Sequence, residues 1–257
     1  MLLAVDIGNT HIVVGLLDDS CRVRCNWRIA GQNHKTEDEY GLLLQWMLQH
    51  AGVAKNELAG GVIASVVPPL TPVFEKAMRV YLGISPLVVG PGTKTGVNIK
   101  YENPKEVGPD RIANAVAGYH KYGGPVIVVD FGTATTFDAI SQNGDYMGGA
   151  IAPGIMTATD ALFSKAARLP RIELVRPPQA IGRNTIQSMQ SGIVFGFAGQ
   201  TDALVKRISA ELGGSPRVVA TGGHAQLVAS ESETITDVDP TLTLEGLYLI
   251  HKMNTRA

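Results

Sequence analysis

Two short stretches of this chain place an acidic side chain beside small and hydroxyl-bearing residues. In the first, an apolar run ends at Asp6, and residues 8–10 (Gly-Asn-Thr) follow. In the second, the β-branched run 126–129 ends at Asp130, and a turn with Gly and Thr at 132–133 follows. A carboxylate at a strand end, beside N–H and hydroxyl groups of a turn, suits a metal-bound phosphate. For either stretch alone, a hairpin with an Asp–Gly-type turn is the structural alternative.

The two stretches repeat one design within a single chain. Asp6 and Asp130 lie 124 residues apart in a chain of 257 residues, and each precedes a small-residue turn and a second apolar segment. This repetition predicts a duplicated domain whose two turns face one another across a cleft. Two unrelated hairpins are the alternative.

The hydrophobic pattern predicts two similar α/β units that resemble the ribonuclease-H fold. A capping box of Thr36 and Glu39 indicates where the first helix begins. The expected elements of the first unit are strands 2–6, 11–17, 22–29, 61–67 and 87–89, and helices 37–50 and 71–82. A helix over 106–122 leads into the second unit, with strands 126–130, 135–141, 146–152 and 217–220, and helices 156–167, 184–212 and 241–253. We expect the domains to be 1–113 and 114–257.

Composition excludes several classes of protein. The net charge of −1 and the pI of about 6.6 give the protein no overall electrostatic attraction to nucleic acid or to an anionic membrane.

Asp6 interrupts the N-terminal apolar run, so we expect no signal peptide, and no apolar stretch is long enough to span a bilayer. Cys21 and Cys25 would lie about 13 Å apart along a strand, too far for a disulfide. We therefore expect free thiols and a cytoplasmic protein.

Several further motifs carry a resemblance to a known family. The Asp6–Thr10, Asp130–Thr133 and Thr221–Gly223 stretches are similar to the phosphate 1, phosphate 2 and adenosine motifs of the acetate kinase/sugar kinase/Hsc70/actin superfamily. Within it, the chain resembles the type III pantothenate kinases. The more specific matches are Gly108-Pro-Asp-Arg111, the Gly148–Gly154 turn and Gly182-Arg-Asn-Thr185. The resemblance implies an actin-like ATPase fold of two ribonuclease-H-like domains with a cleft between them.

The resemblance also implies ATP as phosphoryl donor and Asp110 as the proton acceptor for the substrate hydroxyl. Asp6 would hold Mg²⁺, in part through water, and Asp130 would bind a monovalent cation, K⁺ or NH₄⁺. The structural alternatives are a turn-forming role for Asp6 and a helix cap for Asp110. The implied ATP contacts are Asp6, Ile7, Gly8, Asn9, Thr10, His11, Ile12, Val13 and Thr133.

Pantothenate contacts follow from the same resemblance. The substrate wall would be Gly108, Pro109, Asp110 and Arg111, with the Arg111 guanidinium on the substrate carboxylate. Tyr101 and Thr185 match further substrate contacts. Each has a structural alternative: a surface ion pair for Arg111, a core cover for Tyr101, and the first helical position for Thr185.

The expected reaction is the ATP-dependent phosphorylation of pantothenate, the first step of coenzyme A synthesis. Another small-molecule kinase or a polyphosphate hydrolase on the same fold is one rival, because fold does not decide function. A non-catalytic transcription accessory factor is a second. The resemblance implies a homodimer, and the glycines at 192, 196 and 199 in the long helix would permit close helix approach there. We expect no nucleic-acid or membrane partner.

Overall fold

The computed structural model describes residues 1–31, 34–166 and 169–255. Its contacts divide the chain into two compact units. The first comprises Met1–Asn98, Glu102–Ala117 and Thr241–Ala257, and the second comprises Ile99–Tyr101 and Gly118–Pro240. This grouping differs from the expected boundary at residue 113, because the C-terminal helix returns to the first unit and a three-residue segment joins the second.

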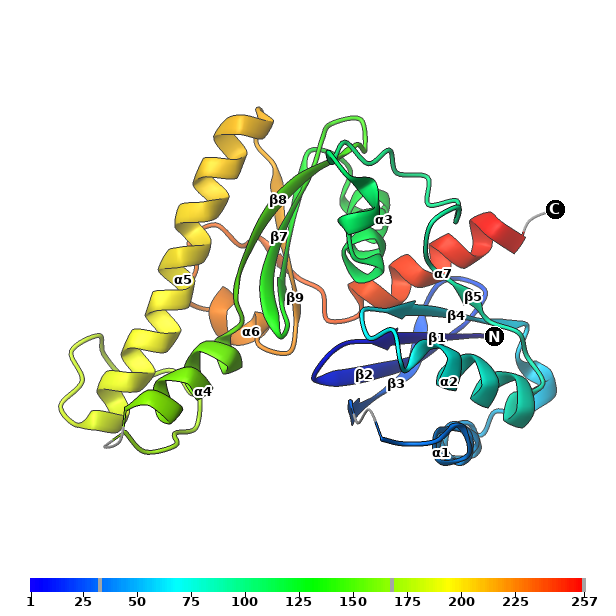
Figure 1. Ribbon diagram of the computed structural model, residues 1–257. Coiled ribbons are helices and arrows are strands. Elements are labelled where there is room, and N and C mark those ends of the chain that lie inside the picture. The colour runs from blue at the N-terminus through cyan, green and yellow to red at the C-terminus, as the bar shows by residue number, and fades with distance from the viewer. Residues whose placement is uncertain (32–33, 167–168, 256–257) are drawn as a thin grey trace. The chain divides into compact units, whose positions relative to one another are not determined.

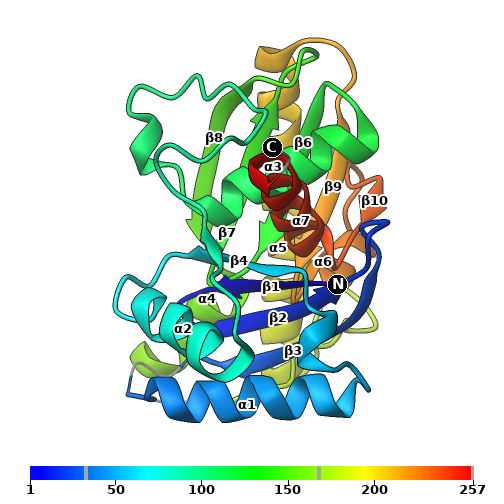
Figure 2. The same ribbon diagram turned by 90° about the vertical axis from the view of Figure 1, so that its right-hand side faces the viewer.

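The first unit is built on a mixed five-stranded sheet with the order β3-β2-β1-β4-β5, of which Figure 2 shows β3, β2, β1 and β4 in sequence. β1 pairs antiparallel with β2 and parallel with β4, so its buried residues lie at the centre of the sheet. The strands are β1 (Leu2–Ile7), β2 (His11–Leu17), β3 (Val23–Ala30), β4 (Gly60–Ser65) and β5 (Leu87–Val88).

The second unit repeats this topology, with the order β10-β9-β6-β7-β8. β6 occupies the place of β1, antiparallel to β7 and parallel to β9. The strands are β6 (Val126–Phe131), β7 (Ala134–Ile140), β8 (Tyr146–Pro153), β9 (Arg217–Gly222) and β10 (Asp237–Val238).

The five strands of one unit match the five of the other in length as well as in order. β1 and β6 also share one burial pattern, with the aspartate as the fifth of six residues and the only one not fully buried. This agreement confirms two similar ribonuclease-H-like units, and it makes Asp6 and Asp130 structural equivalents.

Helices cover both faces of the first sheet (Figure 1). α1 (Glu37–His50) and α2 (Thr71–Ala77), which continues as a π-helical turn over Met78–Leu82, pack with β1 residues 3, 5 and 7. α7 (Leu242–Thr255) packs on the opposite face with residues 2, 4, 62 and 64. α1 begins with the expected capping box of Thr36 and Glu39.

α3 (Pro109–Tyr122) begins in the first unit and ends in the second. In the second unit, α5 (Thr185–Leu212) and α6 (Ala225–Ala229) pack with β6 residues 127, 129 and 131. α4 (Ile155–Lys165) lies beside α5 (Figure 1). Short 3₁₀ turns occupy Lys55–Glu57 and Pro104–Glu106. The expected end of helix 156–167 and the start of the 168–182 connection fall outside the described residues.

Both cysteines are free thiols. Cys21 lies before β3, in a turn where its φ is +65°, whereas we expected it in the strand. Within the described part of the chain, no helix combines the length and the apolar character that a membrane span requires.

Candidate functional site

The turn between β1 and β2 is closed by backbone hydrogen bonds. The Gly8 N–H donates to the carbonyl of His11 at 3.0 Å, and the Gly31 N–H donates to the carbonyl of Thr10 at 2.9 Å. The side chains of Asn9 and Thr10 are exposed. A turn held this way presents polar groups to a ligand instead of to the core.

The neighbouring residues differ in what they offer a ligand. Ile7 and Ile12 pair across the two strands and are fully buried, so only their backbone is available beside the turn. Asp6 pairs with Val13 at the carboxyl end of β1. Partial burial, and then the positive charge of Arg28, lower the pKa of His11, so its imidazole is neutral at pH 7.

Asp110 lies in the first turn of α3, beside the same end of the first sheet. A β-carbon at Gly108 would lie 2.4 Å from Asp110 Oδ1 and 3.5 Å from Val66 Cγ1. The Val66 N–H in turn donates to the carbonyl of Ile7 at 3.0 Å. This chain of contacts links Asp110 to the end of β1, and a side chain at position 108 would collide with its carboxylate.

Burial raises the pKa of Asp110, although the backbone N–H groups of Arg111 and Asp110 and the charge of Arg111 act in the opposite direction. Asp110 Oδ1 accepts the Arg111 N–H at 2.9 Å, so the carboxylate also satisfies one free N–H of the helix start. Asp110 therefore caps α3 in part, as the structural alternative expects, and its carboxyl group is also shielded from water. Arg111 itself is 8% exposed, which does not fit a surface ion pair.

The second turn brings two motifs together within the second unit. Gly222 has φ +92°, and a β-carbon there would lie 2.6 Å from Asp130 Oδ1. Asp130 and Thr221 are register partners on β6 and β9. The phosphate 2 and adenosine motifs therefore meet at one edge of the second sheet, and only glycine fits that approach.

Thr133 is fixed through its carbonyl oxygen. It accepts the N–H of Gly154 at 3.2 Å and the hydroxyl of Thr157 at 2.7 Å, so the residues after β8 and the start of α4 support this turn. The exposed position of Thr133 leaves the turn accessible to a ligand.

Thr185 is the first residue of α5 and is exposed. The Asn184 side chain accepts the N–H of Gln187 at 2.9 Å and so caps α5, while the Gln187 side chain accepts the N–H of Arg183. Thr185 lines a groove of about 820 Å³ between α4 and α5, with Leu162 and Phe197 among its apolar walls.

Tyr101 lies apart from α5, against β8. Its ring packs near Tyr146, with ring centroids 6.4 Å apart, and over Gly148. The structure thus brings Asp6, the 8–11 turn and residues 108–111 to one end of the first sheet, and Asp130, Thr133 and the 221–223 turn to one end of the second.

Sequence reasoning missed the long-range supports of these turns. The local sequence around Gly31 does not predict its contact with the first turn, and the Ser65-Val-Val-Pro68 motif that contains Val66 does not indicate which turn Val66 contacts. Among the described residues, no group of three or more His, Cys, Asp or Glu side chains is arranged to hold a metal ion.

Known structures share this architecture. The activator of 2-hydroxyisocaproyl-CoA dehydratase from Clostridium difficile, solved with bound ADPNP, matches with a TM-score of 0.61 at 13% identity, over 100% of this chain and 97% of that one. An inorganic polyphosphate/ATP-glucomannokinase from Arthrobacter matches with a TM-score of 0.53 at 11% identity, over 100% and 99% of the two chains. With the doubled sheet topology, these likenesses define a two-unit actin-like ATPase fold.

Sequence comparison is more specific. A sequence model of the type III pantothenate kinase family matches residues 2–207. A type III pantothenate kinase from Moorella thermoacetica is 56% identical over 255 residues, which cover 99% of this chain and 100% of that protein. The chain belongs to the type III pantothenate kinase family, and this membership does not favour the rival functions considered above.

Proposed function

We propose how this chain carries out the reaction of its family, the ATP-dependent phosphorylation of pantothenate to 4'-phosphopantothenate in coenzyme A biosynthesis. Identity of 56% to a pantothenate kinase over nearly the whole chain supports the reaction. The observation that supports the chemistry most directly is the desolvated carboxyl group of Asp110 beside the end of β1.

Asp110 acts as the general base in this proposal. Phosphoryl transfer to an alcohol needs the hydroxyl oriented toward the γ-phosphate and a group that accepts its proton. The Asp110 carboxylate is held by the N–H of Arg111, and its raised pKa makes it a better proton acceptor than an exposed aspartate.

ATP binds through its phosphates at the two turns. The backbone-closed 8–11 turn offers N–H and hydroxyl groups, and Asp6 supplies an oxygen ligand of the kind Mg²⁺ prefers. When bound, Mg²⁺ offsets the negative charge of the phosphates. The proposed ATP contacts are Asp6, Ile7, Gly8, Asn9, Thr10, His11, Ile12, Val13 and Thr133.

Pantothenate contacts the residues around Asp110. Arg111 binds the substrate carboxylate through its guanidinium group, while Gly108 and Pro109 leave room beside the base. Tyr101 and Thr185 contribute further contacts. Thr185 is exposed on the rim of the α4–α5 groove. The helix cap uses the side chain of Asn184, so the Thr185 hydroxyl is available to contact the substrate.

Asp130 binds a monovalent cation, K⁺ or NH₄⁺. Its carboxylate lies against Gly222 at the edge where the phosphate 2 and adenosine motifs meet. A monovalent cation there would offset the repulsion between this carboxylate and the phosphates of ATP.

The chain forms a homodimer through α5. Gly192, Gly196 and Gly199 are exposed, and a β-carbon built at any of them meets no described atom within 4 Å. Ile186 on the same helix and Met156 on α4 are 49% and 43% exposed. We also place the protein in the cytoplasm, where free thiols such as Cys21 and Cys25 are usual.

The test is phosphorylation of pantothenate by the purified protein with ATP and Mg²⁺, first in K⁺ and then in Na⁺ buffer. Asp110→Asn should lose at least about 100-fold in kcat. Asp38→Asn is the matched control, because Asp38 is also the second residue of its helix. No turnover of pantothenate in either buffer would contradict the assignment. Light scattering of wild type and Gly196→Arg tests the dimer, which the arginine should dissociate.

A further inference from the structure

A buried tyrosine–aspartate pair lies next to the proposed substrate contact Tyr101. Asp138 on β7 and Tyr146 on β8 are both fully buried. The Tyr146 hydroxyl donates to Asp138 Oδ1 at 2.7 Å, and the Thr136 hydroxyl donates to Oδ2 at 3.3 Å. A buried carboxyl group that accepts such bonds fixes its donors, because breaking a hydrogen bond in the protein interior costs more free energy than breaking one in water.

Tyr146 also holds the backbone that carries Tyr101. The Lys100 N–H donates to the Tyr146 carbonyl at 2.8 Å, and Ile99 forms an isolated parallel bridge with Tyr146. These contacts place residues 99–101 in the second unit, while the residues on either side of this segment belong to the first. One residue of β8 therefore anchors a short segment inside an otherwise long loop.

The ring of Tyr101 packs on the same part of β8. Its centroid lies 6.4 Å from that of Tyr146, with the planes inclined by 55°. A β-carbon at Gly148, whose φ is +111°, would lie 3.4 Å from the Tyr101 ring. Tyr146 thus holds the backbone that leads to Tyr101, and the Tyr101 ring packs against Tyr146 and Gly148.

We propose that Asp138 and Tyr146 are positioning residues that set the affinity for pantothenate by fixing Tyr101. Asp138 orients the phenol of Tyr146, Tyr146 anchors residues 99–101, and Tyr101 contacts the substrate. This inference rests on the proposed role of Tyr101 in binding pantothenate.

Tyr146→Phe tests the first link, because it keeps the ring and removes the hydroxyl. We expect the KM for pantothenate to rise about tenfold, as expected for losing a buried hydrogen bond, while the KM for ATP and kcat change less than twofold. Tyr81→Phe is the matched control: it removes a 2.7 Å bond to Asp38 in the first unit and should leave both KM values unchanged.

A double-mutant cycle tests whether Tyr146 acts through Tyr101. Tyr101→Ala combined with Tyr146→Phe should raise the KM for pantothenate no more than Tyr101→Ala alone. If the double variant instead raises the KM for pantothenate by the product of the two single effects, the proposal is wrong. Asp138→Asn keeps an acceptor for the Tyr146 hydroxyl and should retain most of the affinity, whereas Asp138→Ala should not. Equal losses in these two variants would also contradict it.

Hydrogen exchange separates this inference from the function itself. In the ligand-free protein, the amide of Lys100, which donates to the Tyr146 carbonyl, should exchange at least about tenfold faster in Tyr146→Phe than in wild type. Unchanged exchange overturns the anchoring even where the enzyme is active. A wild-type protein that shows protected amides but no pantothenate turnover would instead refute the proposed function.

Discussion

The backbone N–H of Gly31 donates to the carbonyl oxygen of Thr10 at 2.9 Å, and Gly154 makes the equivalent bond to Thr133 at 3.2 Å. In each unit, the residue after the third strand therefore supports the turn between the first two. The β1–β2 and β6–β7 turns are therefore held by the same backbone contact, which explains how a duplicated sheet supplies two similar polar edges.

The two supporting glycines tolerate a side chain unequally. A β-carbon at Gly154 would lie 2.4 Å from the carbonyl oxygens of Gly132 and Thr133, whereas one at Gly31 would lie 3.3 Å from the nearest carbonyl oxygens. Gly154→Ala must therefore shift the second turn, and we expect the KM for ATP to rise at least about tenfold. Gly31→Ala should change it less than about threefold. Steady-state kinetics with varied ATP checks both, and equal effects would contradict the prediction.

The proposed general base, Asp110, lowers the stability of the folded protein. Burial raises its pKa in the folded state, so the folded protein binds this proton more tightly than the unfolded chain. The ionised carboxyl therefore costs stability, and the cost grows as pH rises from the unfolded pKa, about 3.9, through the folded pKa. Asp110→Asn should melt about 2–4 °C above wild type at pH 7.5.

Thermal unfolding across pH provides the check for this prediction. The difference in Tm between Asp110→Asn and wild type should shrink as pH falls and vanish below the unfolded pKa of about 3.9, where Asp110 is protonated in both states. If the Tm difference stays constant over pH, or if Asp110→Asn melts below wild type at pH 7.5, burial of the ionised Asp110 carboxylate does not destabilise the protein. The same variant should lack activity, so stability and catalysis separate in one protein.

Much of the fold could be predicted because the strands carry local signals. Every predicted strand is present, and the capping box of Thr36 and Glu39 marked the start of α1 within a residue. The misses are short elements, namely α6, β10 and the two 3₁₀ turns, whose few residues carry too little periodicity. The helix expected from residue 106 begins at Pro109, because residues 104–106 form one of these turns. The grouping of α7 with the first unit depends on its apolar contacts with β1 and β4, which no local pattern encodes.

The candidate site divides in the same way. Asp6, Asp110 and Asp130 stand in contiguous motifs, so sequence alone could single them out. The contacts that support the site come from residues far away in the chain. Val66 lies beside Gly108, and Tyr146 lies beside Tyr101. Such supports are apolar or backbone groups, and their residue types do not indicate the site that they serve.

Gly222 is predicted to control the environment of Asp130. Its positive φ disfavours any side chain, and a β-carbon would lie 2.6 Å from Asp130 Oδ1. Gly222→Ala should therefore displace the carboxylate and reduce activation by K⁺ relative to Na⁺, as Asp130→Ala should. Gly214→Ala is the control, since Gly214 also has positive φ (+72°) but its nearest neighbour is Pro125. If K⁺ still activates both Asp130→Ala and Gly222→Ala, the monovalent cation does not bind at Asp130.

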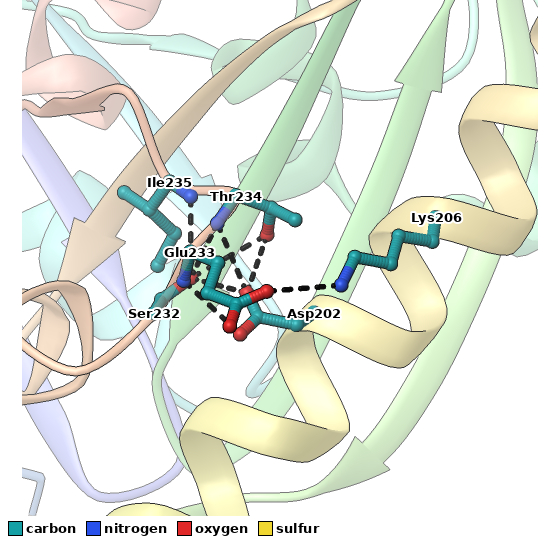
Figure 3. Close-up of polar contacts among 6 residues, drawn as sticks. All are labelled: Asp202, Lys206, Ser232, Glu233, Thr234 and Ile235. Atoms are coloured by element: carbon teal, nitrogen blue, oxygen red, sulfur yellow. Dashed lines mark hydrogen bonds and ion pairs between the residues drawn. The ribbon is translucent and has the colours of Figure 1, made fainter.

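Asp202 on α5 binds the segment before β10 with four hydrogen bonds (Figure 3). Its carboxylate accepts the hydroxyls of Ser232 at 2.6 Å and Thr234 at 2.7 Å, and the N–H groups of Glu233 and Thr234 at 3.1 Å. Burial alone would raise the pKa of Asp202, but these hydrogen bonds outweigh it and the pKa is lowered. The ionised form is therefore the one that stabilises the fold.

A depressed folded-state pKa gives stability that is present above the unfolded pKa, about 3.9, and lost as pH falls through the folded value. Asp202→Ala should therefore cost about 2 kcal/mol or more at pH 7, because it leaves the Ser232 and Thr234 donors without this acceptor. Lys206→Ala is the control: it removes only the exposed 3.1 Å pair with Glu233 and should cost less than about 1 kcal/mol. Denaturant unfolding at pH 7 and pH 3 measures both. The Asp202→Ala deficit should shrink at the lower pH, and a deficit of equal size at both would show that charge on this carboxylate does not hold α5 to the 232–234 segment.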